Sequence, residues 1–135
     1  MTQVIIYKNP NGANVFVCTP SGEVPIETVL TKDCPPGAII VDTESLPQFD
    51  EFFDAWELVD GTVTVNFTKA QEITRTRLRA ERTPLLAAQD ILFQRALETS
   101  ADTSAIVAEK NRLRAITDLV NTASTLDELR GLSCS

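Results

Sequence analysis

The sequence predicts an α+β fold, in which a small antiparallel β domain at residues 1–67 precedes an α-helical hairpin domain with a short terminal helix at residues 68–135. Two observations predict this arrangement. Short runs of β-branched and aromatic residues occur before Thr68, whereas apolar residues recur at helical spacing after it. Acidic residues outnumber basic ones by ten to two in the first domain, while the second carries nine acidic and ten basic residues. We therefore expect two units with different surfaces.

The first domain contains the strand signals. Its β-branched and aromatic runs are Gln3–Tyr7, Val15–Thr19, Ala38–Thr43, Glu57–Val59 and Val63–Phe67. Asn-Pro and Asn-Gly pairs between the first two runs predict a hairpin turn at residues 8–14, and Asp60-Gly61 predicts a second tight hairpin. Residues 25–30 predict one helical turn, because proline is favoured in the first turn of a helix.

The helical domain is predicted to begin at Thr68. Residues 68–71 have the spacing of a capping box, in which the side chains of the threonine and the glutamine each bond the backbone amide of the other. On a helical wheel, Ala70, Ile73 and Ala80 form one apolar side of this helix.

Charged residues of the same helix are candidates for contacts with other proteins. Arg77 falls on the apolar side with Glu81 one turn later, and an ion pair is costly to bury, so the two are interpreted as the rim of an interface. Arg75, Arg79 and Arg82 form a row on another side. This row could be a solvated face, a docking site for carboxylates, or a contact for nucleic-acid phosphates.

Thr83-Pro84 interrupts the helical pattern, and either a new helix starts there or a continuous helix is kinked. The following segment, 85–98, carries apolar residues over an arc wider than one helix–helix contact needs. Such a surface favours self-association or the binding of a partner. The interface candidates on this segment are Leu85, Leu86, Leu92, Phe93 and Leu97.

The rest of the helical domain is expected to pack against this first part. Residues 100–104 predict a loop, and the helix after it carries a narrow apolar stripe of Ile106, Leu113, Ile116 and Val120. Residues 125–128 repeat the spacing of a capping box and predict a last short helix that ends at Gly131.

Aromatic residues and acids gather near the end of the first domain. Phe52, Phe53 and Trp56 are expected to pack inward beneath a charged rim and to make this domain a docking candidate. The acids of that rim are Asp50, Glu51, Asp54 and Glu57. The cluster lacks the central glycine of a calcium-binding loop, so we interpret it as a surface rim rather than a metal site or a pair of catalytic carboxylates.

The sequence predicts a protein that is not an enzyme. It contains no histidine and none of the glycine-rich or nucleophile motifs that hold phosphates or activate serine, so no catalytic, cofactor or metal residue is expected. Cys18, Cys34 and Cys134 form no CxxC pair, which favours a reducing compartment without a disulfide framework. The chain shows neither a signal-peptide pattern nor 18 consecutive apolar residues, so we expect no membrane contact and synthesis in the cytoplasm.

Four further segments follow one another in a fixed order. They are DCPPGAIIVDTESLP, FFDAWEL with its Asp-Gly hairpin, KAQEI, and LRAERTPLLAAQD followed after a loop by Lys110, Leu113 and Arg114. In this order they resemble small proteins encoded beside tail and tail-fibre genes in tailed bacteriophages, including those called tail fibre assembly or tail assembly chaperone proteins. The resemblance spans about residues 30–120. It implies a non-enzymatic protein that contacts tail or tail-fibre components.

The predicted function is therefore that of a phage structural or assembly protein of the tail or fibre region, acting through protein–protein contacts. It would be made in the host cytoplasm, form a homo-oligomer and reach the virion. A head decoration or connector protein of the virion is an alternative. A small nucleic-acid-binding regulator that uses Arg75, Arg79 and Arg82 is a second alternative, although the net charge of −7 makes nucleic acid an unfavoured partner.

Overall fold

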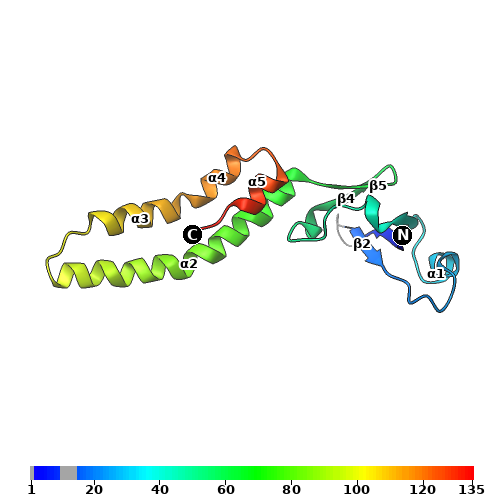
Figure 1. Cartoon of the computed structure of the whole chain (residues 1–135), viewed down its shortest axis with the longest axis horizontal. Helices are drawn as coiled ribbons and strands as arrows, with labels where there is room; N and C mark the ends of the chain where they lie inside the picture. Colours follow the sequence, from blue (N-terminus) through cyan, green and yellow to red (C-terminus); the bar gives the residue numbers. More distant parts are fainter. Residues whose placement is uncertain (1, 10–14) are drawn as a thin grey trace. The chain divides into compact units, whose positions relative to one another are not determined.

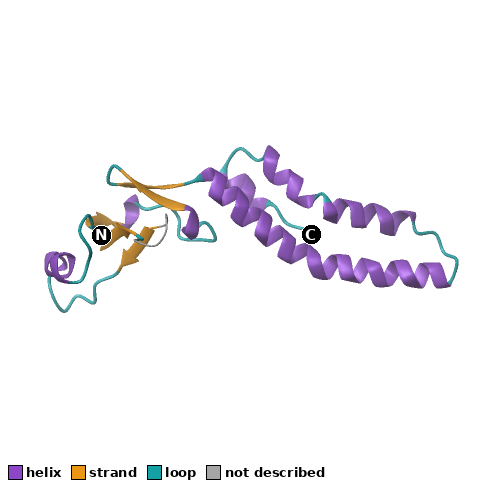
Figure 2. Cartoon of the chain, turned by 180° about the vertical axis from the view of Figure 1, so that it is seen from behind, coloured by secondary structure: helices purple, strands orange, loops and turns teal. Residues whose placement is uncertain are grey.

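A computed structural model describes residues 2–9 and 15–135, and it divides the chain into two compact units, Met1–Lys69 and Ala70–Ser135 (Figure 1). Antiparallel strands occupy the first unit, and a long helix followed by shorter helices forms most of the second (Figure 2). The predicted α+β class is confirmed.

The first unit contains a three-stranded antiparallel sheet with the strand order β2-β1-β3. Its strands are β1 (Gln3–Lys8), β2 (Val15–Cys18) and β3 (Ile39–Asp42). In this register Ile6 of β1 lies opposite Val17 on one neighbour and Ile39 on the other. The predicted pairing of the first two runs is confirmed, and most of the predicted turn, residues 10–14, lies outside the described residues.

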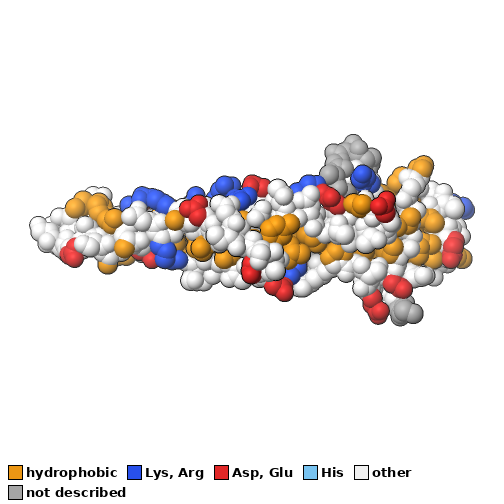
Figure 3. Space-filling view, turned by 90° about the horizontal axis from the view of Figure 1, so that it is seen from above, with side chains coloured by type: hydrophobic (Ala, Val, Ile, Leu, Met, Phe, Trp, Pro, Cys, Tyr) orange, Lys and Arg blue, Asp and Glu red, His pale blue; other side chains and the backbone are white. Residues whose placement is uncertain are grey.

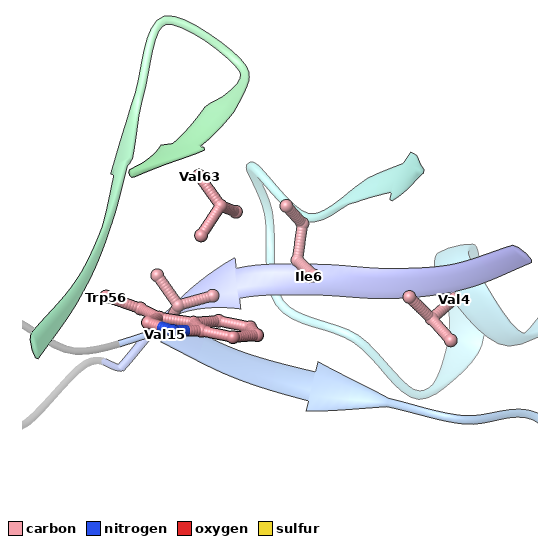
Figure 4. Close-up of a cluster of buried hydrophobic side chains, with 5 residues drawn as sticks. All are labelled: Val4, Ile6, Val15, Trp56 and Val63. Atoms are coloured by element: carbon pink, nitrogen blue, oxygen red, sulfur yellow. The ribbon is translucent and has the colours of Figure 1, made fainter. Parts of the chain in front are cut away.

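Both sides of β1 are buried. Val4 and Ile6 on one side join Val15, Trp56 and Val63 in a hydrophobic cluster (Figure 4). Ile5, which strand alternation directs to the opposite side, is also fully buried. Helix α1 (Ile26–Lys32) contacts β1 and β3 and buries Val29, so the predicted helical turn is a helix of seven residues.

The second hairpin pairs β4 (Trp56–Val59) with β5 (Thr62–Val65). Asp60 has φ 52° and Gly61 has φ 80°, the left-handed conformation that a two-residue type I′ turn requires at both positions. The hairpin predicted from Asp60-Gly61 is confirmed. Short 3₁₀ turns at Thr43–Ser45 and Phe53–Ala55 lie before it.

Helix α2 (Phe67–Glu98) runs without a break through Pro84, so the continuous form of the two predicted outcomes is observed (Figure 1). The helix begins earlier than predicted, at Phe67 rather than Thr68. The side-chain oxygen of Asn66 accepts from the backbone N–H of Lys69 at 3.0 Å, which places the cap two residues before Thr68. Glu57 favours Asn66 over Thr68 as the cap. Its carboxylate accepts from the side-chain amide of Asn66 and lies 3.5 Å from the Lys69 ammonium.

The buried side of α2 also differs from the predicted one. Ala70, Thr74 and Leu78 are fully buried at intervals of four residues, whereas Ala80 is exposed and Ile73 is half-buried. A threonine fits this packed line because its hydroxyl donates to the Ala70 carbonyl at 2.9 Å and leaves no unsatisfied polar group.

The chain returns along α2 through α3 (Ser104–Arg114), a 3₁₀ turn at Ile116–Asp118 and α4 (Leu119–Thr122) (Figures 1 and 2). The predicted stripe is confirmed where Leu113, Ile116 and Val120 are buried, and Ile106 is half-buried. The structure contains a tighter turn where one helix was predicted. Consecutive β-branched side chains, Ile116 and Thr117, weaken the helical preference at that point.

The last helix, α5 (Leu126–Gly131), has the predicted cap. The Thr125 hydroxyl accepts from the backbone N–H of Glu128 at 3.1 Å, and the Glu128 carboxylate accepts from the backbone N–H of Ser124. Leu129 is fully buried, which fixes this helix to the rest of the second unit.

The corrected start of α2 gives a direct test. We expect Asn66→Ala to lower the free energy of unfolding by about 1 kcal/mol, because the first-turn amide of Lys69 and the Glu57 carboxylate both lose a partner. Thr68→Ala is the matched control and should change it by less than about 0.5 kcal/mol. Urea unfolding followed by far-UV circular dichroism measures both, and a larger effect of Thr68→Ala would restore the original capping box.

Candidate functional site

A hollow of about 700 Å³ lies on the surface of the first unit. One wall consists of Val4 from β1, Val17 from β2 and Thr19 just after β2, and the segment after β3 contributes the second wall. The residues of that wall are Thr43, Glu44, Leu46, Pro47, Gln48, Phe49, Phe53 and Trp56. The lining is largely apolar, which suits an apolar side chain better than a reacting polar group.

The aromatic residues of this wall differ strongly in exposure. Phe52 and Trp56 are buried, so these two predicted docking residues act mainly as core anchors. Phe53 is half-buried, and its ring centre lies 4.9 Å from those of both Phe49 and Trp56. Phe49 was not among the predicted site residues, yet it is 75% exposed and lines the hollow. Its position between Pro47 and Asp50, in a polar loop, was the signal that could have identified it.

One polar atom beneath the hollow lacks a partner. The indole Nε1–H of Trp56 is buried, and no acceptor for it exists within the described residues. A buried donor without an acceptor costs about 1–3 kcal/mol.

Two of the four acids in the predicted charged rim, Asp50 and Glu57, have structural roles. The Asp50 carboxylate accepts from the backbone N–H of Phe52 at 2.9 Å and shapes the loop. The side-chain amide of Asn66 lowers the pKa of the Glu57 carboxyl, with a further contribution from Lys69. Among the described residues, no group of three or more cysteines and acids is placed to hold a metal ion.

Arg77, a predicted interface residue, is held within the second unit. Its guanidinium donates to the carbonyl oxygens of Leu132 at 2.8 Å and Leu129 at 3.1 Å, and it pairs with Glu81 at 3.0 Å. The last carbonyls of a helix lack the regular partners of its interior, and the planar fork of arginine donates to two of them here. Arg77, which Glu81 pairs with on the same helix, thus fixes the end of α5 to α2.

The row of Arg75, Arg79 and Arg82 is divided by its contacts. Arg75 donates to the side chain of Asn121 at 2.6 Å and pairs with Glu72, and Arg82 donates to the carbonyl oxygen of Arg114 at 3.0 Å. Arg79 is exposed. Two of the three side chains therefore join α2 to the returning segment.

The apolar candidates of the second half of α2 differ in exposure. Leu86 and Phe93 are half-buried, whereas Leu85, Leu92 and Leu97 are exposed by 41%, 45% and 60%. Hydrophobic side chains reach the surface over the end of the α2–α3 hairpin (Figure 3). Ile91 and Val107 are also exposed there, and sequence reasoning did not include them.

We name Leu85, Ala88 and Leu92 the α2 stripe, because their spacing places them along one side of the helix. Lys110 of α3 contacts two other residues of this part of α2. The Lys110 ammonium lies 5.2 Å from the centre of the Phe93 ring and 2.6 Å from the Asp90 carboxylate. Lys110 of α3 thus covers Phe93, whereas Leu85, Ala88 and Leu92 are all exposed.

Two of the three cysteines have thiols with a raised pKa. Burial and the adjacent Cys18 thiol raise the pKa of Cys34. Burial also raises the pKa of Cys134, whose Sγ lies 3.5 Å from the Leu78 carbonyl oxygen. Both thiols therefore stay protonated to higher pH than an ordinary cysteine, which lowers their reactivity.

Comparison with protein-family models, curated proteins and solved structures gives no match for this chain. The likeness to phage tail-region proteins consequently stays a prediction. None of the helices in the described part of the chain combines the length and apolar character of a membrane span.

The Arg77 contacts lead to a stability prediction. Arg77→Met should lower the free energy of unfolding by about 1–3 kcal/mol, because the carbonyl oxygens of Leu129 and Leu132 each lose a charged donor. Arg79→Met, which removes an exposed charge of the same helix, should change it by less than about 0.5 kcal/mol. Urea unfolding and amide hydrogen exchange of residues 129–135 measure the effect. Equal effects of the two variants would contradict the anchoring role of Arg77.

Glu128 makes the cap of α5 dependent on pH. The backbone N–H and hydroxyl of Ser124 lower the pKa of this carboxyl. A lowered pKa in the folded state means that the stabilisation is complete above the pKa of the unfolded chain and is lost as pH falls through the folded value. We expect residues 126–132 to lose protection from hydrogen exchange in acid, after correction for the intrinsic rate.

The control for this prediction is charge removal at the neighbouring position. Glu128→Gln should abolish most of the pH dependence, whereas Asp127→Asn should preserve it, because Asp127 pairs with Arg130 and does not cap the helix. If Glu128→Gln still lost hydrogen-exchange protection in acid, a group other than Glu128 would cause the pH dependence of α5.

Proposed function

We propose that this chain is a non-enzymatic structural or assembly protein of a tailed bacteriophage, acting in the tail or tail-fibre region through protein–protein contacts. It is made in the host cytoplasm, self-associates, and binds a tail or fibre protein on the way to the virion. The observation that supports a contact function best is the α2 stripe. The phage assignment itself rests on the sequence resemblance.

The second half of α2 does not bury enough surface to explain its composition. The buried residues of α2 are Ala70, Thr74, Leu78 and Ala96, so the last twenty positions contribute one small side chain to the interior. The opposing helix α3 contributes Leu113 alone. A hairpin packed this thinly gains stability when another surface covers it.

Magnitudes indicate how large that surface has to be. Complete burial of one leucine side chain contributes about 1.5–3 kcal/mol, whereas association costs about 4–15 kcal/mol. Leu85 and Leu92 are only 41% and 45% exposed, so covering them recovers less than half of this contribution for each residue and does not by itself offset the cost. The contact therefore extends to further exposed residues of the same region, such as Ile91, Leu97 or Val107.

The contacts described above do not favour the regulator alternative. Arg75 and Arg82 bind atoms of their own unit, and nine acids share that unit with its cations. A head decoration or connector protein would use the same apolar surface. The copy number in purified particles separates that alternative from a tail component.

The proposal is tested by placing charge in the stripe. We expect Leu85→Asp with Leu92→Asp to reduce the molar mass to that of a monomer in light scattering, and to abolish co-purification with a co-expressed tail or fibre protein. Leu119→Asp in α4 is the matched control, because Leu119 and Leu92 are both 45% exposed. An unchanged mass and unchanged partner binding in the double variant would contradict the contact function.

The phage assignment has its own measurement. Peptide mass spectrometry compares density-purified particles with the crude lysate. Fixed stoichiometry in the particle indicates a structural component, and abundance in the lysate alone indicates an assembly factor. Retention on nucleic acid that falls steeply with salt, together with absence from particles, would support the regulator instead.

A further inference from the structure

We propose that the hollow on the first unit binds an extended peptide segment of a partner protein, with one large apolar side chain flanked by lysine or arginine. This inference goes beyond the function proposed above. It concerns the other unit, and it holds whether or not the α2 stripe mediates self-association.

The size and lining of the hollow set the apolar part of the occupant. A volume of about 700 Å³ accommodates one large side chain together with the backbone around it. Val4, Val17 and Leu46 supply an aliphatic surface, and Phe53 and Trp56 supply an aromatic one. A leucine or an aromatic side chain matches both surfaces.

Phe49 shows that the lining is incomplete without an occupant. Its ring lies 4.9 Å from Phe53 and 6.2 Å from Trp56, measured between centres, yet 75% of the residue is exposed. An aromatic ring held in a defined packing arrangement gains most when its free face is also covered. A side chain inserted into the hollow would cover Phe49.

Charge selects a basic partner. The segment that builds the second wall carries five acids in thirteen residues, which are Asp42, Glu44, Asp50, Glu51 and Asp54. No lysine or arginine occurs between Lys32 and Lys69, so all ionisable side chains of this segment that carry a charge near neutral pH are acidic. Glu44 is exposed and lines the hollow. Flanking cations on the occupant would complement this potential, while phosphates and anionic headgroups would be repelled.

The sheet edge favours an extended peptide over a compact ligand. Strand β2 lies at the edge of the three-stranded sheet, and its described partner is β1 alone. Val17 of β2 lines the hollow, so a peptide anchored there runs beside an edge strand that can bond its backbone.

The chain contains a single tryptophan, so Trp56 itself reports on the hollow. Blocked synthetic hexapeptides are titrated into the full-length protein while Trp56 fluorescence is recorded. The probe is Ac-Lys-Thr-Val-Phe-Thr-Lys-amide. One comparison peptide has serine in place of phenylalanine, and another has glutamate in place of both lysines. We expect saturable binding of the probe and at least tenfold weaker binding of each comparison peptide.

Matched variants locate the binding. Phe49→Ala should weaken the probe about tenfold, whereas Phe16→Ala, which removes an exposed ring that packs on Tyr7 instead, should not. Glu44→Lys should weaken the basic probe and improve the acidic peptide, whereas Glu23→Lys makes the same change in net charge outside the hollow. Circular dichroism confirms that each variant is folded.

Three outcomes would overturn the proposal: no saturable response to the probe, equal binding of the three peptides, or wild-type affinity in Phe49→Ala. The molar mass of each variant is recorded in the same samples. Loss of peptide binding at unchanged mass isolates the hollow. A change in mass with unaltered peptide binding concerns the α2 stripe alone.

Discussion

The size of each unit constrains everything else in this protein. Domains of about sixty residues bury a smaller fraction of their surface than larger ones and have little core to stabilise them. Here two such units share one chain, Met1–Lys69 and Ala70–Ser135. Each unit compensates for its small core in a different way. Each also leaves apolar side chains exposed at its surface.

The first unit concentrates its aromatic residues, and the second relies on polar anchors. Seven of the eight aromatic residues precede Lys69, so Phe52 and Trp56 can fill most of a small core. The helical unit has Phe93 alone and instead uses arginines that donate to backbone carbonyls. Arg77 binds the end of α5, Arg82 binds the Arg114 carbonyl, and Arg112 binds the Cys134 carbonyl at 2.8 Å. These contacts hold segments in place without adding buried area.

Local chemistry explains which features the sequence revealed. Asp60-Gly61 and Thr125 each specify their turn or cap through neighbouring residues, so both could be predicted. Asn66 and Thr68 are locally similar as caps, and contacts with Glu57, nine residues before Asn66, decide between them. Arg77 was recognisable as an unusual cation on an apolar side. Its acceptors lie 52 and 55 residues further along the chain, and no local pattern indicates them.

The candidate sites also differ in how far they could be predicted from local sequence. The α2 stripe could be predicted because its members follow one another at helical spacing on one element. The hollow combines Val4, Val17 and a wall some forty residues away, so its existence depends on the register of the sheet. Phe49 was visible in the sequence as an aromatic residue, but its exposure was not.

The two surfaces differ in the physical forces that govern them, and this difference separates their roles. The α2 stripe is apolar and belongs to a unit with nearly balanced charge, so contacts made through it depend weakly on salt. The hollow lies within an acidic segment, and binding there weakens as salt screens the flanking cations. If both proposed contacts are made, raising the salt concentration would weaken the contact at the hollow and leave the contact at the stripe intact. The proposed assembly role would use this difference, because an oligomer held through the stripe could release a partner bound at the hollow.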